Sequence, residues 1–163
     1  MKDLDFDPYK TKEAFRKNYK LHDLAEIHGK NLLIQWGFDF KEFGKDSRHK
    51  KVWEGGEDQP DLIINYKGKK ALIDWKGKHH PAWLANKRAV LSYENWKNKL
   101  NMPVLICFSL FSSNDSFLDF KFACIGVHKY SSSDKKEWDK NTTVEFEKNL
   151  PEFSKPNVLM YLI

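Results

Sequence analysis

Apolar residues near the beginning of the chain recur at roughly helical spacing. The pattern predicts a helix over residues 11–36, in which the recurring apolar residues are Leu21, Leu24, Ile27, Leu32, Leu33 and Trp36. Gly29 weakens the middle of this predicted helix, and Gly37 is suited to end it. The stretch 38–43 then alternates apolar and polar residues, which is typical of a half-exposed strand. A charged loop is expected over residues 44–59.

Two short apolar runs separated by a glycine-containing turn predict a β-hairpin. The first run covers residues 62–65, the turn 66–69, and the second run 71–76. A helix is expected at 85–100, closed by Met102 and Pro103. The run 104–111 is apolar on both faces, as in a central strand of a sheet. The remaining pattern predicts a strand at 120–128, a surface loop at 131–141, and edge strands at 144–146 and 158–163. This order of elements indicates a mixed α/β sandwich.

Composition narrows the class of protein. The chain has 163 residues, which fits a single domain over residues 1–163, with a core at about 21–111 and C-terminal strands and loops at 112–163. No apolar run approaches a membrane span and no secretion signal is visible, so we expect a soluble, intracellular, cytoplasmic protein without a membrane partner. Cys107 and Cys124 sit in apolar runs and are expected to be buried free thiols. The net charge of +5 mildly favours a polyanionic partner.

One group of residues has the composition that phosphodiester hydrolysis needs. Asp74 and Lys76 are two apart on a predicted strand, so both project from the same face. Asp61 follows Pro60 at the start of the facing strand, and folding of the hairpin brings Asp61 near Asp74. Carboxylates are ligands that Mg²⁺ prefers, and an ammonium nearby can orient water or screen a phosphate. The hairpin therefore predicts a metal-dependent hydrolytic site.

This arrangement resembles a known superfamily. Pro60-Asp61, twelve residues, then Asp74-Trp75-Lys76 is similar to the motif of the PD-(D/E)XK nucleases, which include type II restriction enzymes and archaeal Holliday junction resolvases. The predicted element order also resembles their αβββαβ core. The resemblance implies a restriction-endonuclease-like three-layer sandwich with a central mixed sheet. It implies that Asp61, Asp74 and the backbone carbonyl of Trp75 bind Mg²⁺, with Mn²⁺ able to substitute, and that Lys76 serves the attacking water.

The same resemblance suggests further residues. Many members add an acid on the first helix, for which Glu26 is the candidate, with Glu54 and Glu57 in the charged loop as rivals. Cationic and polar side chains near the motif, in the loop and on the following helix are candidates for contact with nucleic acid. These are Lys50, Lys51, Lys78, Lys87, Arg88 and Tyr93.

Each feature also has a plainer interpretation. Other acid-x-Lys triplets occur in the chain, among them Asp119-Phe120-Lys121 and Asp134-Lys135-Lys136, but neither of these two follows a Pro-Asp strand through a short turn. Asp74 alone could form an internal salt bridge. His22 and Glu26 lie one helical turn apart, and a solvated surface pair is the simpler explanation for them.

The sequence thus predicts a Mg²⁺-dependent endonuclease that hydrolyses DNA, with a structure-specific substrate such as a junction or flap as one form of that hypothesis. Analogy suggests a homodimer, because cutting two strands symmetrically needs two sites. The alternatives are a catalytically inactive nucleic-acid-binding module of the same fold, an RNA nuclease, and an interaction domain whose charged residues form an ion pair.

Overall fold

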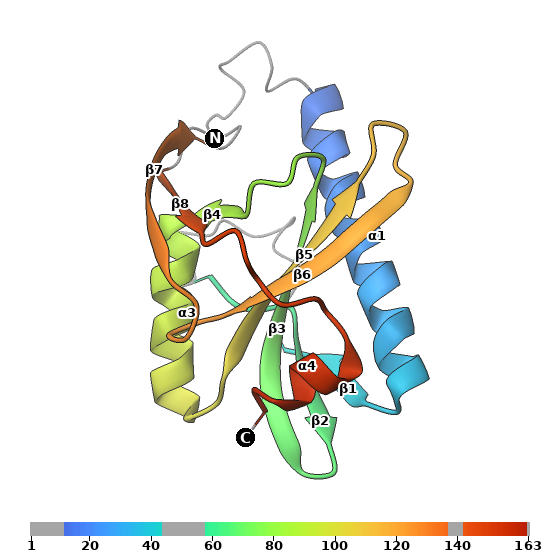
Figure 1. Ribbon diagram of the computed structural model, residues 1–163, viewed down its shortest axis with the longest axis vertical. Helices are drawn as coiled ribbons and strands as arrows, with labels where there is room; N and C mark the ends of the chain where they lie inside the picture. The colour runs from blue at the N-terminus through green and yellow to red at the C-terminus, as the bar shows by residue number, and fades with distance from the viewer. Residues whose placement is uncertain (1–11, 44–57, 137–141, 163) are drawn as a thin grey trace.

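The fold is a β-sheet flanked by helices (Figure 1). The computed structural model describes residues 12–43, 58–136 and 142–162. In chain order the elements are α1 (Lys12–Trp36), β1 (Asp39–Glu42), β2 (Leu62–Tyr66), β3 (Lys69–Lys78), β4 (Leu84–Asn86), α3 (Lys87–Leu100), β5 (Val104–Phe111), β6 (Phe117–Cys124), β7 (Tyr130–Lys136), β8 (Thr142–Phe146) and α4 (Lys155–Leu159).

The main sheet has the strand order β1-β2-β3-β5-β6. Its neighbours are antiparallel except for β3 and β5, which run parallel. Alternate side chains of β3 enter two separate cores: Ile73 and Trp75 pack on the side of α1, and Leu72 packs on the side of α3. Figure 1 shows the two helices on opposite sides of the sheet. The prediction of a three-layer α/β sandwich with a mixed central sheet is confirmed. The αβββαβ order holds for the elements of the main sheet and its two helices, with β4 of a second sheet inserted before α3.

The β2–β3 hairpin closes where its sequence predicts. Lys67 and Gly68 have φ angles of 53° and 88°. Two successive left-handed residues suit the right-handed twist of the strands, and glycine adopts this conformation without steric cost. The Gly68 N–H also donates a 2.9 Å hydrogen bond to Asn65 Oδ1. This turn fixes the register that places Leu62 opposite Ile73.

Tertiary pairing changes two of the predicted elements. The helix expected at 85–100 begins at Lys87, because Leu84–Asn86 form β4 and pair with β8. The polar stretch expected to be a loop at 131–141 forms β7 as far as Lys136, while 137–141 lie outside the described residues. Strand β7 lies at the edge of a second sheet of order β4-β8-β7, where serine side chains can face water. The run 144–146 belongs to β8 and is the middle strand of that sheet, not an edge.

The C-terminal apolar run expected as a strand at 158–163 instead begins within a short helix and continues as a turn, with residue 163 outside the described residues. Residues Lys155–Leu159 form α4, whose first turn contains Pro156. Ser154 caps this helix by accepting a 3.4 Å hydrogen bond from the Asn157 N–H. The strand expected at 120–128 forms as β6, three residues earlier, and chain reversal occurs at Gly126 with φ of 86°.

Two glycines allow α1 to lie very close to β3. A Cβ at Gly29 would stand 2.2 Å from Cζ3 of the Trp75 indole, and a Cβ at Gly77 would stand 2.3 Å from the Leu21 carbonyl oxygen. Gly29 therefore has a packing role that its low helix propensity alone does not reveal. The close contact places the helix face around His22 over the end of β3. None of the helices in the described ranges combines the length and apolar character needed to span a membrane.

Candidate active site

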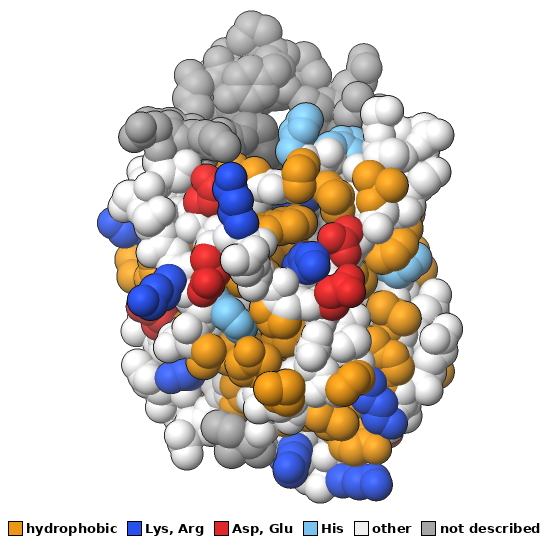
Figure 2. Space-filling view, in the orientation of Figure 1, with side chains coloured by type: hydrophobic (Ala, Val, Ile, Leu, Met, Phe, Trp, Pro, Cys, Tyr) orange, Lys and Arg blue, Asp and Glu red, His pale blue; other side chains and the backbone are white. Residues whose placement is uncertain are grey.

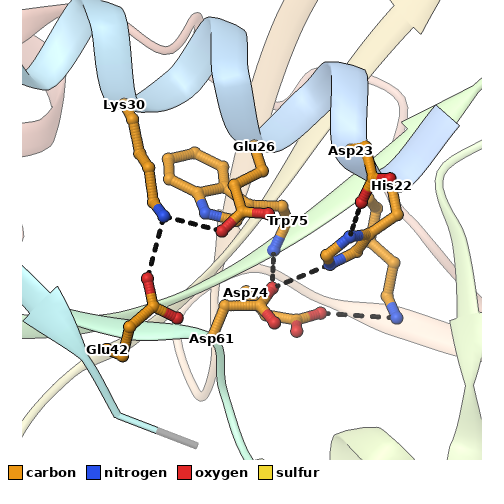
Figure 3. Close-up of polar contacts among 9 residues, drawn as sticks. His22, Asp23, Glu26, Lys30, Glu42, Asp61, Asp74 and Trp75 are labelled. Carbon is orange, nitrogen blue, oxygen red and sulfur yellow. Dashed lines mark hydrogen bonds and ion pairs between the residues drawn. The ribbon is translucent and has the colours of Figure 1, made fainter. Parts of the chain in front are cut away.

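Asp61 and Asp74 lie close together where β2 begins beside β3 (Figure 3), and Lys76 contacts Asp74 there. Lys76 Nζ lies 3.3 Å from Asp74 Oδ2. The Asp74 side chain is 7% exposed, whereas that of Lys76 is 27% exposed and can reach solvent. The hairpin thus brings together the three residues that the sequence motif singles out, in a place that is buried on one side and open on the other.

The Asp61 carboxylate is held by two donors. Its Oδ2 accepts a 2.8 Å hydrogen bond from the Trp75 backbone N–H and lies 3.4 Å from His22 Nε2. The Asp61 N–H donates to the Ile73 carbonyl, and its own carbonyl accepts from the Phe43 N–H. Burial would raise the pKa of Asp61, but the hydrogen bond and charge of His22, together with the Trp75 N–H, hold that pKa below its usual value. Asp61 is therefore a fixed, ionised carboxylate.

The backbone carbonyl of Trp75 faces the same edge of the strand as Asp61. The Leu72 N–H donates to the Pro103 carbonyl, on the β5 side, while the Ile73 carbonyl accepts from Asp61, on the β2 side. Backbone groups of successive strand residues alternate between the two edges. The N–H and carbonyl of Trp75 therefore both point to the β2 side, consistent with the bond from this N–H to Asp61.

The environment of Asp74 disfavours its charged form, in contrast to that of Asp61. Burial raises the pKa of Asp74 to about 7, and the negative charge of Asp61 adds to this effect against the attraction of Lys76. The Tyr93 hydroxyl donates a hydrogen bond to the carboxylate. Even so, Asp74 Oδ2 is buried without an aligned hydrogen bond, and its contact with Lys76 is an ion pair only. A buried carboxylate oxygen without a hydrogen bond, beside a second carboxylate, fits a hard divalent cation.

His22 takes a place that sequence reasoning did not give it. It was expected to form a solvated surface pair with Glu26, but it lies against Asp61 and its side chain is 35% exposed. Burial would lower the pKa of His22, but the hydrogen bond and charge of Asp61 outweigh it and raise the pKa to about 9. The available signal was its position between Leu21 and Ala25, since both of those residues face the core.

The α1 side of the site carries further donors. Ligand atoms of His22, Asp23 and Glu26 lie within 4.8 Å of one another. Glu26, the predicted additional acid, pairs with Lys30 at 2.7 Å, and Lys30 also reaches Glu42 on β1 at 2.8 Å (Figure 3). Glu26 is thus near the site with its carboxylate already in an ion pair, and its role stays a prediction. Its rivals Glu54 and Glu57 lie outside the described residues.

The residues predicted to contact nucleic acid are distributed unevenly. Lys50 and Lys51 lie outside the described residues. Lys78 is half-buried at the end of β3, and Lys87 is exposed at the start of α3. Arg88 is exposed but its Nε donates a 3.0 Å hydrogen bond to Asp58 Oδ2. On the face shown in Figure 2, acidic and basic side chains are interspersed instead of gathered by sign.

Tyr93 requires a correction. It was a candidate for contact with nucleic acid, but its side chain is buried, with 3% exposed. The reason is that its side of α3 packs against the sheet, where the phenol hydroxyl finds Asp74 as its acceptor. Tyr93 thus contacts a candidate metal ligand and not the solvent.

Comparisons with known proteins give a similarity in structure and none in sequence. No protein-family model matches the chain, and no curated protein matches it by sequence. Among solved structures, the chain is similar to Hjc, a Holliday junction resolvase from the archaeal hyperthermophile Archaeoglobus fulgidus. The two are 11% identical, with a TM-score of 0.45, over 74% of this chain and 85% of that chain.

Proposed function

We propose that this protein is a metal-dependent endonuclease that hydrolyses DNA phosphodiester bonds. The observation that carries the proposal is the convergence of Asp61, Asp74 and Lys76, with the buried Oδ2 of Asp74 lacking an aligned hydrogen bond. Burying two carboxylates together is costly unless a cation offsets their repulsion. Polar residues gathered at such cost are more often functional than structural.

The donor set suits Mg²⁺, with Mn²⁺ as a substitute. Asp61, Asp74 and the carbonyl of Trp75 would hold the ion, since all three offer oxygen. When bound, such an ion lowers the pKa of water and offsets charge on a phosphate. The protein groups have separate tasks: the Trp75 N–H fixes Asp61, Tyr93 holds Asp74, and Lys76 positions the attacking water or the phosphate.

A second candidate is a nucleic-acid-binding module without catalysis. The observation that favours it is the arrangement of cations: His22 lies 3.4 Å from Asp61, and Lys76 lies 3.3 Å from Asp74. These side chains offset both acids without a metal ion. Glu26 is paired with Lys30 in the same way. We prefer the enzyme because Lys76 and His22 are partly exposed and can move aside for an ion.

A cleavage assay separates the two candidates. Labelled duplex, single-stranded, flap and four-way-junction DNA, with single-stranded RNA beside them, would be incubated with Mg²⁺, Mn²⁺ or a chelator. The variants are Asp74→Ala and Lys76→Ala. Asp119→Ala is the matched control, because Asp119 belongs to another acid-x-Lys triplet, in which Lys121 Nζ lies 4.0 Å from it.

We expect metal-dependent cutting of DNA that Asp119→Ala retains. Loss of several kcal/mol of transition-state stabilisation should reduce cutting by about 10³-fold or more in Asp74→Ala and Lys76→Ala. Cutting that survives Asp74→Ala in a clean preparation contradicts the enzyme. Equal DNA binding by all proteins with no cutting favours the inactive module, and cutting of RNA alone assigns the RNA nuclease.

A further inference from the structure

Three side chains of α3 bind the same residue, Asp58. The Arg88 Nε–H donates to Asp58 Oδ2 at 3.0 Å, and the Trp96 Nε1–H donates to the Asp58 carbonyl at 3.0 Å. Ser92 Oγ accepts from the Asp58 N–H at 3.3 Å. Arg88, Ser92 and Trp96 are four residues apart, so they form one stripe along the helix. The side chain, N–H and carbonyl of Asp58 are therefore all bound to one rigid element.

This binding takes place just before Asp61. Only Gln59 and Pro60 separate Asp58 from Asp61, and Pro60 is buried with the restricted φ angle of proline. The Asp58 side chain is 15% exposed and Ser92 is 6% exposed. The two residues between Asp58 and Asp61 have little conformational freedom to compensate for a displacement of Asp58. Such a displacement would therefore move Asp61 as well.

The same helix also holds the other acid. Tyr93, next to Ser92, donates its hydroxyl to the Asp74 carboxylate from a buried position. Helix α3 thus contacts β3 at Asp74 and the start of β2 through Asp58. Contacts with this one helix therefore help to fix the distance between the Asp61 and Asp74 carboxylates. The hydrogen bond from the Trp75 N–H to Asp61 also contributes.

We propose that Arg88, Ser92 and Trp96 form a clamp on Asp58 that sets the position of Asp61 relative to Asp74, and so the affinity of the site for a divalent ion. Arg88 is in this view a positioning residue for the metal site, and not the phosphate contact that its place in the sequence suggested. This inference rests on the proposed function, because it concerns the metal site of that enzyme.

The rival role of Arg88 makes a different prediction. A guanidinium that contacts a phosphate releases a counterion on binding, so removing it reduces the salt slope of DNA binding by about one. A positioning residue acts on the metal site when no DNA is present. Outer residues that orient metal ligands typically change metal affinity by about 10–100-fold when they are removed.

The experiment is a calorimetric Mn²⁺ titration of the full chain without DNA. The variants are Arg88→Gln, Asp58→Asn and the double variant. Lys87→Gln is the matched control, since it removes the same charge one residue earlier, on a different side of the helix. Asp74→Asn reports binding outside the site. Thermal melts confirm that each variant folds, and Asp58→Asn keeps the shape of the side chain it replaces.

We expect Arg88→Gln and Asp58→Asn each to weaken Mn²⁺ binding by about tenfold or more. The double variant should be no weaker than either single one, because both remove the same contact. Lys87→Gln should bind Mn²⁺ as the unaltered protein does, because the contact with nucleic acid predicted for Lys87 plays no part in a titration without DNA. Unchanged affinity in Arg88→Gln, or losses that add in the double variant, overturns the clamp alone. An unaltered protein that binds Mn²⁺ no better than Asp74→Asn overturns the proposed function, and the clamp with it.

Discussion

The Trp75 backbone N–H donates a 2.8 Å hydrogen bond to the side chain of Asp61. The register that pairs Leu62 with Ile73 would place Pro60 opposite Trp75 if the ladder continued. The Asp61 carboxylate instead takes the place of a backbone acceptor, and β2 begins only at Leu62. The pairing of β2 with β3 therefore stops short of Trp75, beside Asp74. One side chain both interrupts the strand pairing and supplies a candidate ligand.

Asp74 should make the metal-free protein less stable as pH rises. Its pKa is raised from 3.8 to about 7 in the folded protein. The folded state therefore holds a proton that the unfolded state releases between these values, and stability falls as pH rises through that window. Asp74→Asn removes this titration, so the variant should lack that part of the decline.

Chemical denaturation between pH 4 and pH 7 in the presence of a chelator measures the effect. The quantity to compare is the difference in unfolding free energy between the unaltered protein and Asp74→Asn, because Asp61 titrates in the opposite direction. A difference that stays constant with pH contradicts the raised pKa of Asp74. Addition of Mg²⁺ should stabilise the unaltered protein and leave Asp74→Asn unchanged.

His22 should oppose metal binding at neutral pH. Its pKa of about 9 means that a positive imidazolium lies beside Asp61 at pH 7. A divalent ion bound by Asp61 has to overcome that charge. His22→Gln should therefore bind Mg²⁺ more tightly than the unaltered protein at pH 7. In the unaltered protein, Mg²⁺ affinity should increase between pH 7 and pH 9 as the imidazolium loses its proton, and the variant should lack this part of the increase.

Mg²⁺ titrations at several pH values test this sign. His79→Gln is the control, because His79 also pairs with an aspartate, Asp115, at 3.1 Å. That pair involves neither Asp61 nor Asp74. Weaker Mg²⁺ or Mn²⁺ binding in His22→Gln would instead identify the imidazole as a ligand, in agreement with its closeness to Asp23 and Glu26.

Gly29 should resist substitution although it lies inside a helix. A Cβ there would meet the Trp75 indole at 2.2 Å, in a core that cannot move freely. Overpacking typically costs about 1–3 kcal/mol, and the gain in helix propensity returns at most about 1 kcal/mol. Gly29→Ala should thus lower the free energy of unfolding by up to about 2 kcal/mol when the full gain in helix propensity is subtracted. The control is Asn31→Ala, an exposed position of α1 that should be neutral or stabilising. A Gly29→Ala protein as stable as Asn31→Ala contradicts the close packing.

The two cysteines should be almost unreactive in the folded protein. Burial raises the pKa of the Cys107 thiol well above its usual range and that of Cys124 from 9.0 to about 11. Because only the thiolate reacts, Cys124 presents about a hundredfold less reactive form at pH 8 than an ordinary thiol. In denaturant, a disulfide exchange reagent should label both cysteines. In buffer, where the protein is folded, it should label each of them only slowly. Rapid labelling of the folded protein contradicts their burial.

Those parts of the structure that depend on neighbours along the chain could be predicted from the amino-acid sequence alone. The helical period between residues 11 and 36 corresponds to α1, and the doubly apolar run 104–111 is β5. The glycine turn fixes the hairpin, and a short hairpin leaves little choice over which residues face one another. For that reason Asp61, Asp74 and Lys76 could be grouped before any tertiary contact was known.

Which helix faces meet the sheet depends on tertiary contacts and could not be predicted in the same way. Strand β4 forms because Ala85 pairs with Val144 of β8, which is far along the chain. Strand β7 pairs with the other edge of β8. His22 meets Asp61 because α1 approaches β3 at two glycines. Tyr93 and Arg88 are turned toward Asp74 and Asp58 by the packing of α3. A periodic pattern gives the face of a helix, but its partner depends on contacts between residues distant in sequence, which local patterns do not encode.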